Sequence, residues 1–276
     1  MPSGFPIRLA LLALVLVPPV ARADDQPFLT LDATDIEPES GHELEQNFGW
    51  NHGLAGRAYS GFEGETEWEY GYDDRLQLAV ATAYGWSRTH PHLFPAIPAE
   101  GHGEWSGIEG EAIYQAMNVY FDPIGLGFKF HAAAGPAERS FAATILLQKN
   151  FFNDRLRLVT NIGGEVGRAK DGAWSDTSAL TVDAGAAYNI TWSWSAALEF
   201  NAERDYSAIL FGGRDAATTS YYAGPTLQYV AHPWTASLGV QAQLPWSHDV
   251  SAPTSQAFVA DAPRWRIGLR VTRDFY

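Results

Sequence analysis

Hydrophobic and polar residues alternate with a period of two through most of this chain. Within residues 75–87, for example, Leu78 and Val80 fall on one face, whereas Gln77 and Ala79 fall on the other. Such alternation predicts strands whose two faces meet different environments. The same pattern recurs in residues 234–244 and 264–275. We therefore expect an all-β protein.

The spacing of the strands predicts how they connect. Twelve strands are expected, near residues 41–50, 62–72, 75–87, 105–118, 124–134, 140–150, 156–167, 178–188, 191–203, 220–230, 234–244 and 264–275. Short turns between them alternate with connections that are mostly longer, at 51–61, 88–104, 135–139, 168–177, 204–219 and 245–263. An even strand count with short periplasmic turns and longer extracellular loops is typical of bacterial outer-membrane barrels. A soluble sandwich has no reason to sort its loops in this way.

Aromatic residues support a membrane location. Trp68, Tyr70 and Trp194 lie beside short turns, whereas Trp50 and Trp86 lie beside longer connections. Amphipathic rings at both ends of the strands are expected where a barrel crosses the two lipid interfaces. We therefore expect a single transmembrane, antiparallel, up-and-down β-barrel of about 12 strands over residues 41–276, in the outer membrane of a Gram-negative bacterium.

The N-terminal 40 residues lack this alternation. Arg8, the apolar run from Leu9 to Val17, and the Ala21-Arg22-Ala23 site predict a secretory signal peptide over residues 1–23, because the apolar run is too short to span a bilayer as a helix. Residues 24–40 show no periodicity, and we interpret them as a periplasmic N-terminal segment that precedes the first strand.

Composition excludes several classes of protein. The chain has no cysteine, so neither a disulfide framework nor a lipid-modified cysteine is available. Its net charge is −14, and no cluster of basic residues occurs, so nucleic acid is not an expected partner. The expected partners are outer-membrane lipid and, during insertion, the barrel-assembly machinery, since the chain ends in an alternating strand with Phe275. The sequence does not fix the oligomeric state.

Several segments resemble a known group of proteins. They are EWEYGYDDRLQLAV at 67–80, GIEGEAIYQ at 107–115, DPIGLGF at 122–128, ILLQKNFFNDRLRL at 145–158, YYAGPTLQY at 221–229 and QLPW at 243–246. In their order and spacing they resemble a family of uncharacterised proteobacterial outer-membrane β-barrel proteins, distantly similar to porin-like proteins of a MetA-pathway for phenol degradation. The resemblance implies the barrel and its location, but it brings no substrate and no site residue.

Charged residues concentrate on the face that the alternation directs into the lumen. The acidic residues are Glu43, Glu45, Glu63, Glu65, Glu67, Glu69, Glu109, Glu111, Glu165, Glu199 and Glu203, and the basic residues are Lys129, Arg157, Arg264, Arg266 and Arg270. Closure of the barrel should bring the arginines of the last strand near Glu43 and Glu45. Two interpretations stay open: a salt-bridge lattice that seals the lumen, and a passive porin-like channel whose acidic lining favours cationic solutes.

Other functions are weaker hypotheses. His90 and His92 form a His-x-His pair, but both fall in an expected exposed loop, so we expect no metal site and no cofactor. A lipid hydrolase would need a serine and a histidine together on the lipid-facing side near the outer rim, and the pattern places His131 in the lumen, so we expect no enzyme and no catalytic residue. A structural barrel that binds partners through the loops from Tyr206 to Thr219 and from Pro245 to Pro263 is the remaining alternative.

Overall fold

The computed structural model describes residues 26–54, 57–91, 100–209, 218–249 and 262–275. The expected signal peptide lies outside these residues. The described residues form thirteen strands, and no helix among them is long and apolar enough to cross a membrane. The strands are β1 (His42–Leu54), β2 (Arg57–Asp73), β3 (Leu76–Pro91), β4 (Glu100–Met117), β5 (Gly125–Ala134), β6 (Glu138–Phe151), β7 (Leu156–Asp171), β8 (Ala173–Asn189), β9 (Trp194–Tyr206), β10 (Thr218–Ala231), β11 (Trp234–Gln243), β12 (His248–Asp249) and β13 (Trp265–Phe275).

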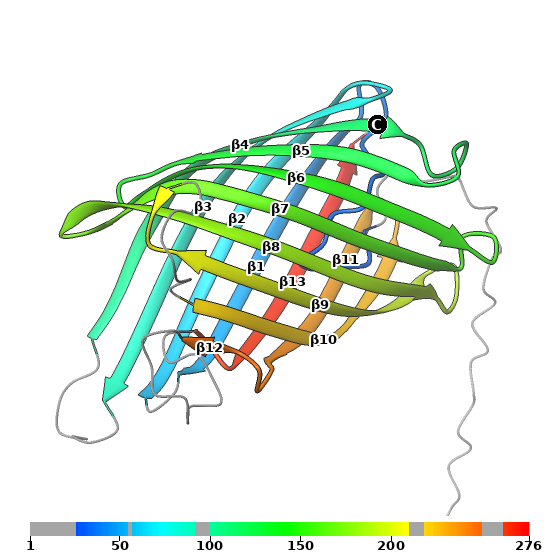
Figure 1. Cartoon of the computed structure of the whole chain (residues 1–276). Coiled ribbons are helices and arrows are strands. Elements are labelled where there is room, and N and C mark those ends of the chain that lie inside the picture. Colours follow the sequence, from blue (N-terminus) through cyan, green and yellow to red (C-terminus); the bar gives the residue numbers. More distant parts are fainter. Residues whose placement is uncertain (1–25, 55–56, 92–99, 210–217, 250–261, 276) are drawn as a thin grey trace, which may run out of the picture.

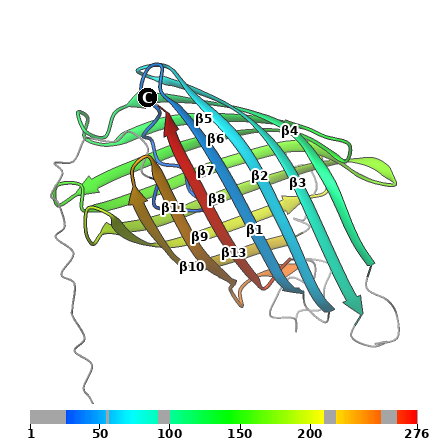
Figure 2. The same ribbon diagram turned by 180° about the vertical axis from the view of Figure 1, so that it is seen from behind.

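The strands close into a barrel. From β1 to β11, each strand pairs antiparallel with the next, β11 pairs with β13, and β13 pairs with β1. The two-residue strand β12 attaches to the start of β10. Figures 1 and 2 show the tilted strands surrounding one lumen from opposite sides. The expected twelve-stranded, antiparallel, up-and-down barrel is confirmed, and its closure leaves no long strand with an unpaired edge.

The two ends of the barrel differ. At one end, which we call the turn end, lie β1's first residue, β13's last residue and connections such as the one from Asp73 to Leu76. At the opposite end, the loop end, the strands are longer than expected. The expected loops at 51–61 and 168–177 are largely strand, because β1 and β2 pair as far as Leu54 and Arg57, and β7 and β8 pair around Gly172. Backbone hydrogen bonds continue there although the apolar alternation has stopped, so the hydrophobic pattern alone could not reveal them.

The alternation sets which side chains face outward. On β3, Leu78 and Val80 are 39% and 54% exposed, whereas Gln77 and Ala81 are 2% and 7% exposed. Apolar side chains therefore cover the outer surface of the barrel, and small or polar side chains line its interior. This inversion of the usual soluble arrangement is what a barrel surrounded by lipid requires.

Residues 26–41 lie inside the barrel, and we call them the lumenal segment. We expected residues 24–40 to form a periplasmic segment before the first strand; residues 26–40 instead cross the lumen near the turn end before the chain enters β1, as the dark blue trace in Figure 1 shows. Phe28, Leu31 and Ile36 are buried there. An apolar side chain gains free energy by leaving water, and the interior of the barrel offers apolar partners for these three.

Candidate lumenal site

Inward-facing glutamines hold the backbone of the lumenal segment. The Gln148 side chain accepts a hydrogen bond from the Thr34 amide (2.8 Å), and Gln115 donates one to the Thr34 carbonyl (2.6 Å). Gln77 accepts from the Glu37 amide (2.7 Å), and Gln228 donates to the Gln26 carbonyl (2.7 Å). The segment forms no strand, so these side chains satisfy backbone groups that a neighbouring strand would otherwise satisfy.

Glu199 of β9 binds the segment most extensively. Its carboxylate accepts hydrogen bonds from the Leu29 amide (3.0 Å), the Thr30 amide (3.0 Å) and the Thr30 hydroxyl (2.8 Å). Thr226 of β10 donates a further hydrogen bond to it. Glu199 is 1% exposed, so its charge is stabilised by these donors instead of by water. Its observed role is to hold the segment.

Apolar contacts fix the segment on two sides of the lumen. Phe28 and Leu31 pack with the inward-facing residues Val159, Ala187 and Ala197, and Ile36 packs with Ile113 and Leu146. Glycines leave the space that these side chains need. A Cβ at Gly185 would lie 2.6 Å from a ring carbon of Phe28, and one at Gly239 would lie 2.5 Å from a methyl carbon of Leu29. The inner surface is therefore shaped to fit the segment.

Ion pairs connect the segment to the barrel wall. Lys129 of β5 lies 2.9 Å from the Asp32 carboxylate and 2.6 Å from that of Glu111. The Arg157 guanidinium of β7 lies 3.9 Å from the Asp35 carboxylate. Burial raises the pKa of Asp32, but the charge of Lys129, followed by that of Arg270, outweighs burial, so this pKa lies below its ordinary value.

A polar cavity of about 270 Å³ remains beside the lumenal segment. Seven carboxylate residues line it, against two permanently cationic residues and His131, so its lining is strongly acidic. The acidic residues are Asp32, Glu45, Glu65, Glu67, Glu69, Glu109 and Glu111, and the cationic residues are Lys129 and Arg270. A second cavity of about 10 Å³, closer to the turn end, shares Gln26, Glu45 and Arg270 with the first and adds Glu43.

Strand register places carboxylates opposite carboxylates along the seam of the barrel. Glu43 of β1 pairs with Glu69 of β2 on one side and with Asp274 of β13 on the other, and Glu45 pairs with Glu67. Three groups of carboxylates have ligand atoms within 4.8 Å of one another: Glu37 with Glu43 and Asp274, Glu43 with Glu45 and Glu69, and Glu45 with Glu65 and Glu67. Each group shares a member with the next, so they form a continuous acidic row from the turn end to the large cavity. Like charges at cross-strand positions repel unless cations or protons offset them.

The structure places the charged residues expected in the lumen at three kinds of location. Those that line the large cavity are Glu45, Glu65, Glu67, Glu69, Glu109, Glu111, Lys129 and Arg270. Those next to the smaller cavity or the lumenal segment are Glu43, Glu199 and Arg157. Those farther toward the loop end are Glu63, which accepts a hydrogen bond from Asn51, the partly buried Glu165, and Arg264 and Arg266.

The arginines of the last strand do not form one row against Glu43 and Glu45. Arg270 lies 3.3 Å from Glu45, as closure of the barrel predicts. Arg266 instead lies over the ring of Tyr222 and 3.8 Å from Glu203, and Arg264 is exposed just before β13. The residue of β13 opposite Glu43 is Asp274. The expected lattice is therefore incomplete at the turn end.

The metal-site, hydrolase and surface-binding hypotheses depend on histidines and loops. Some of these residues lie outside the described part of the chain. His92 lies in 92–99 and is not described, and the side chain of His90 is likewise not described. His131 faces the cavity and lies 2.8 Å from the Glu109 carboxylate. Parts of the expected loops at 204–219 and 245–263, namely 210–217 and 250–261, also lie outside the described residues.

The role of residues 26–41 was missed because they lack periodicity. One signal was available: Phe28, Leu31 and Ile36 are large apolar residues in a segment interpreted as a solvated leader. Asp32 and Asp35 lie between these apolar residues in the sequence, and they pair with Lys129 and Arg157 of the wall. Sequence reasoning could have noted that a leader in water gains nothing from these apolar side chains.

Comparison with protein families gives one match that covers most of the chain. Residues 20–256 match the family of unknown function DUF6662. The chain belongs to this family. No curated protein matches the sequence.

Solved structures share the architecture of this DUF6662 protein. It is similar to the COG4313 outer membrane channel from Pseudomonas putida F1, with a TM-score of 0.65, 12% identity, and coverage of 89% of this chain and 100% of that chain. It is also similar to the NanC porin (TM-score 0.54, 10% identity, 84% and 99% covered) and the KdgM porin (TM-score 0.51, 9% identity, 85% and 99% covered). At these identities the likeness shows the fold, which is that of outer-membrane β-barrel channels.

Proposed function

We propose that this protein is a passive outer-membrane channel for small cations or small cationic solutes, with the turn end in the periplasm. The observation that carries the proposal is the acidic cavity, in which seven carboxylates face two permanent cations. Charges concentrated in a space with low-dielectric walls raise the local concentration of oppositely charged solutes and exclude like charges. The similarity to channels and porins supports transport as the general role.

The lumenal segment determines how much of the channel is open. Its contacts with Glu199, Gln148 and Lys129 place it beside the cavity near the turn end. A solute crossing from the loop end to the turn end would pass the acidic row formed by Glu67, Glu45 and Glu43. The proposal needs no catalytic group: the chemistry required is electrostatic attraction and exclusion.

Reversal potentials test the proposal. The full-length protein in a planar bilayer under a KCl gradient should prefer K⁺ to Cl⁻, and this preference should weaken at higher ionic strength because salt screens the field. Replacing Glu45, Glu65 and Glu67 with Gln should shift the reversal potential toward zero. The control is Glu63→Gln with Glu104→Gln, which removes two exposed carboxylates from the loop end and should change selectivity much less than two of the three cavity substitutions together. Anion preference, or selectivity unchanged by the triple substitution, would contradict the proposal.

A sealed structural barrel is the second candidate, because the lumenal segment is held by hydrogen bonds, ion pairs and apolar contacts together. The same bilayer recordings separate the two. A barrel that conducts neither as the full chain nor after removal of residues 26–39 is a structural or surface-binding protein, whereas measurable cation current in either form supports the channel.

A further inference from the structure

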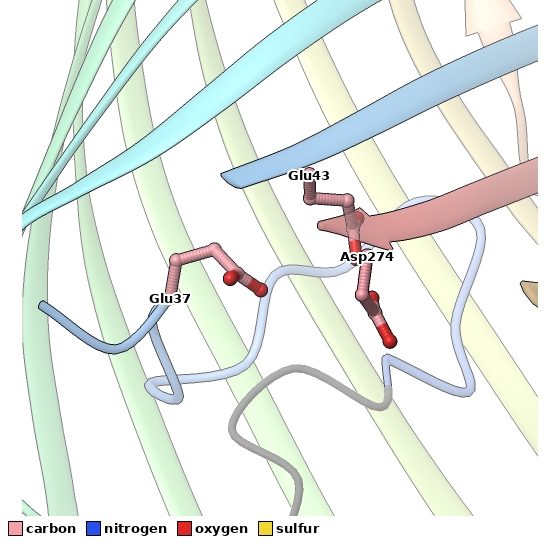
Figure 3. A group of neighbouring side chains, drawn as sticks. All are labelled: Glu37, Glu43 and Asp274. Carbon is pink, nitrogen blue, oxygen red and sulfur yellow. The ribbon is translucent and has the colours of Figure 1, made fainter. Parts of the chain in front are cut away.

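Carboxylates from three separate parts of the chain converge at the turn end of the lumen. Glu37 comes from the lumenal segment, Glu43 from the start of β1 and Asp274 from the end of β13 (Figure 3). Each offers one oxygen, and these oxygens lie within 4.8 Å of one another. Glu43 and Asp274 are partners across the seam at which the last strand closes on the first. The cluster therefore lies where segment, first strand and last strand meet.

The burial of Glu37 also indicates that the cluster binds a ligand. It is 1% exposed, and its Oε2 has no hydrogen-bond partner among the described residues. Its backbone amide donates a hydrogen bond to Gln77 (2.7 Å), and its carboxyl group points toward the cluster (Figure 3). A buried carboxylate oxygen without a donor is unfavourable unless a proton or a cation satisfies it. Burial, and then the negative charge of Asp274, raise the pKa of Glu37 to about 7.

Two basic side chains that adjoin the cluster in sequence contact aromatic rings. The Arg273 guanidinium, next to Asp274 in sequence, lies over the rings of Trp234 and Phe275. The His42 ring, next to Glu43, stacks on Tyr70. His232 approaches Asp274, with its Nδ1 3.6 Å from the carboxylate, and its side chain is 55% exposed. An exposed histidine that is charged only when protonated is a weak counterion for Asp274.

We propose that Glu37, Glu43 and Asp274 bind a single divalent cation, Ca²⁺ in preference to Mg²⁺, which fastens the lumenal segment to the seam of the barrel. Ca²⁺ binds six to eight oxygens at about 2.3–2.6 Å, so two of its ligands lie no more than about 5 Å apart, and the cluster meets that limit. Ca²⁺ also accepts irregular carboxylate geometry, whereas Mg²⁺ demands a near-ideal octahedron. The proposal concerns how the segment is held, and it stands apart from which solute the lumen admits.

Calcium-dependent heat resistance tests the site. The full-length protein is refolded in a zwitterionic detergent free of lipopolysaccharide, stripped with EDTA and titrated with CaCl₂. Its unfolding temperature is read from the heat-modifiable band on gels, and binding is read directly by calorimetry. A cation that binds only the folded state raises the unfolding temperature with increasing concentration. We expect a rise of several degrees at millimolar CaCl₂, one bound ion linked to it, and a smaller rise with MgCl₂.

Two variants test whether the calcium-dependent rise in unfolding temperature depends on Glu37. Glu37→Gln keeps size and removes one charge, so it should abolish the calcium-dependent rise; in EDTA it should be at least as heat-resistant as the native protein, because carboxylate repulsion is reduced. Glu39→Gln makes the same charge change two residues away at an exposed position and should keep the full response. A Glu37→Gln protein that still responds to CaCl₂, or a native protein without any response, would overturn the site. A native protein that responds more strongly to MgCl₂ would overturn the preference for Ca²⁺.

Discussion

Lys129 of β5 and Asp32 of the lumenal segment form an ion pair of 2.9 Å inside the barrel, and the same ammonium lies 2.6 Å from Glu111. One cation thus joins the segment to the wall and offsets two carboxylates. The Lys129 side chain is 21% exposed, so water screens this interaction only in part.

Removing that cation should destabilise the barrel. Lys129→Met leaves Asp32 and Glu111 without their shared cation in a poorly solvated lumen, and we expect a loss of about 2–4 kcal/mol in the free energy of unfolding. Urea unfolding in detergent micelles measures it. The control is Arg168→Met, which breaks an ion pair with Asp176 of the same length whose side chains are 58% and 47% exposed, and which should cost no more than about 1 kcal/mol. Equal losses of unfolding free energy from the two substitutions would show that Lys129 stabilises the barrel no more than an exposed ion pair does.

Deleting residues 26–39 while retaining the signal peptide should open the turn end. Ser40 and Gly41 remain to form backbone hydrogen bonds with Gly71 of β2, so the start of β1 stays attached to its neighbour. Single-channel recordings should show a larger conductance than the full-length protein, because the segment no longer occupies the lumen. Conductance that is unchanged, with the barrel still heat-modifiable, would show that the segment does not limit the path.

A larger side chain at Gly185 should displace the segment without touching the outer surface. Gly185→Leu places atoms where the Phe28 ring lies, since even a Cβ would come within 2.6 Å of it. We expect a larger conductance and faster proteolysis of residues 26–41. Ala186→Leu is the matched control, because neighbouring residues of a strand face opposite sides and residue 186 faces outward. Similar conductance changes in both proteins would mean that Gly185 does not seat the segment.

A charge on the outer face should impair the barrel more than one on the inner face. Val80 is 54% exposed on the lipid-facing side, and Val80→Arg should cost up to about 2–4 kcal/mol, depending on its depth in the bilayer. Ala81→Arg faces an acidic cavity and should cost less. Folding yields and urea midpoints in lipid vesicles measure both. The reverse order would place the strand register off by one residue.

Much of the barrel could be predicted because its physical cause is local. A strand between lipid and lumen must alternate, so Leu78 and Val80 against Gln77 and Ala81 reveal both the strand and its orientation. The short turn from Asp73 to Leu76 and the position of Phe275 then indicate direction and closure. The sequence pattern did not predict that β1 extends to Leu54 and β7 to Asp171, because backbone pairing beyond the membrane needs no apolar alternation.

The sequence by itself determined the twelve strands of the barrel, the inward face of β2 and the surplus of acidic residues, since each follows from period-two spacing and composition. Only the tertiary structure decided that residues 26–41 enter the lumen, that Glu43 faces Asp274 across the seam, and that Glu37 joins them. Glu43 and Asp274 are 231 positions apart in the sequence, and Phe28 and Val159 are 131 apart. These relationships depend on closure of the barrel and on packing of Phe28 and Leu31 against its inner wall, and no local pattern encodes either.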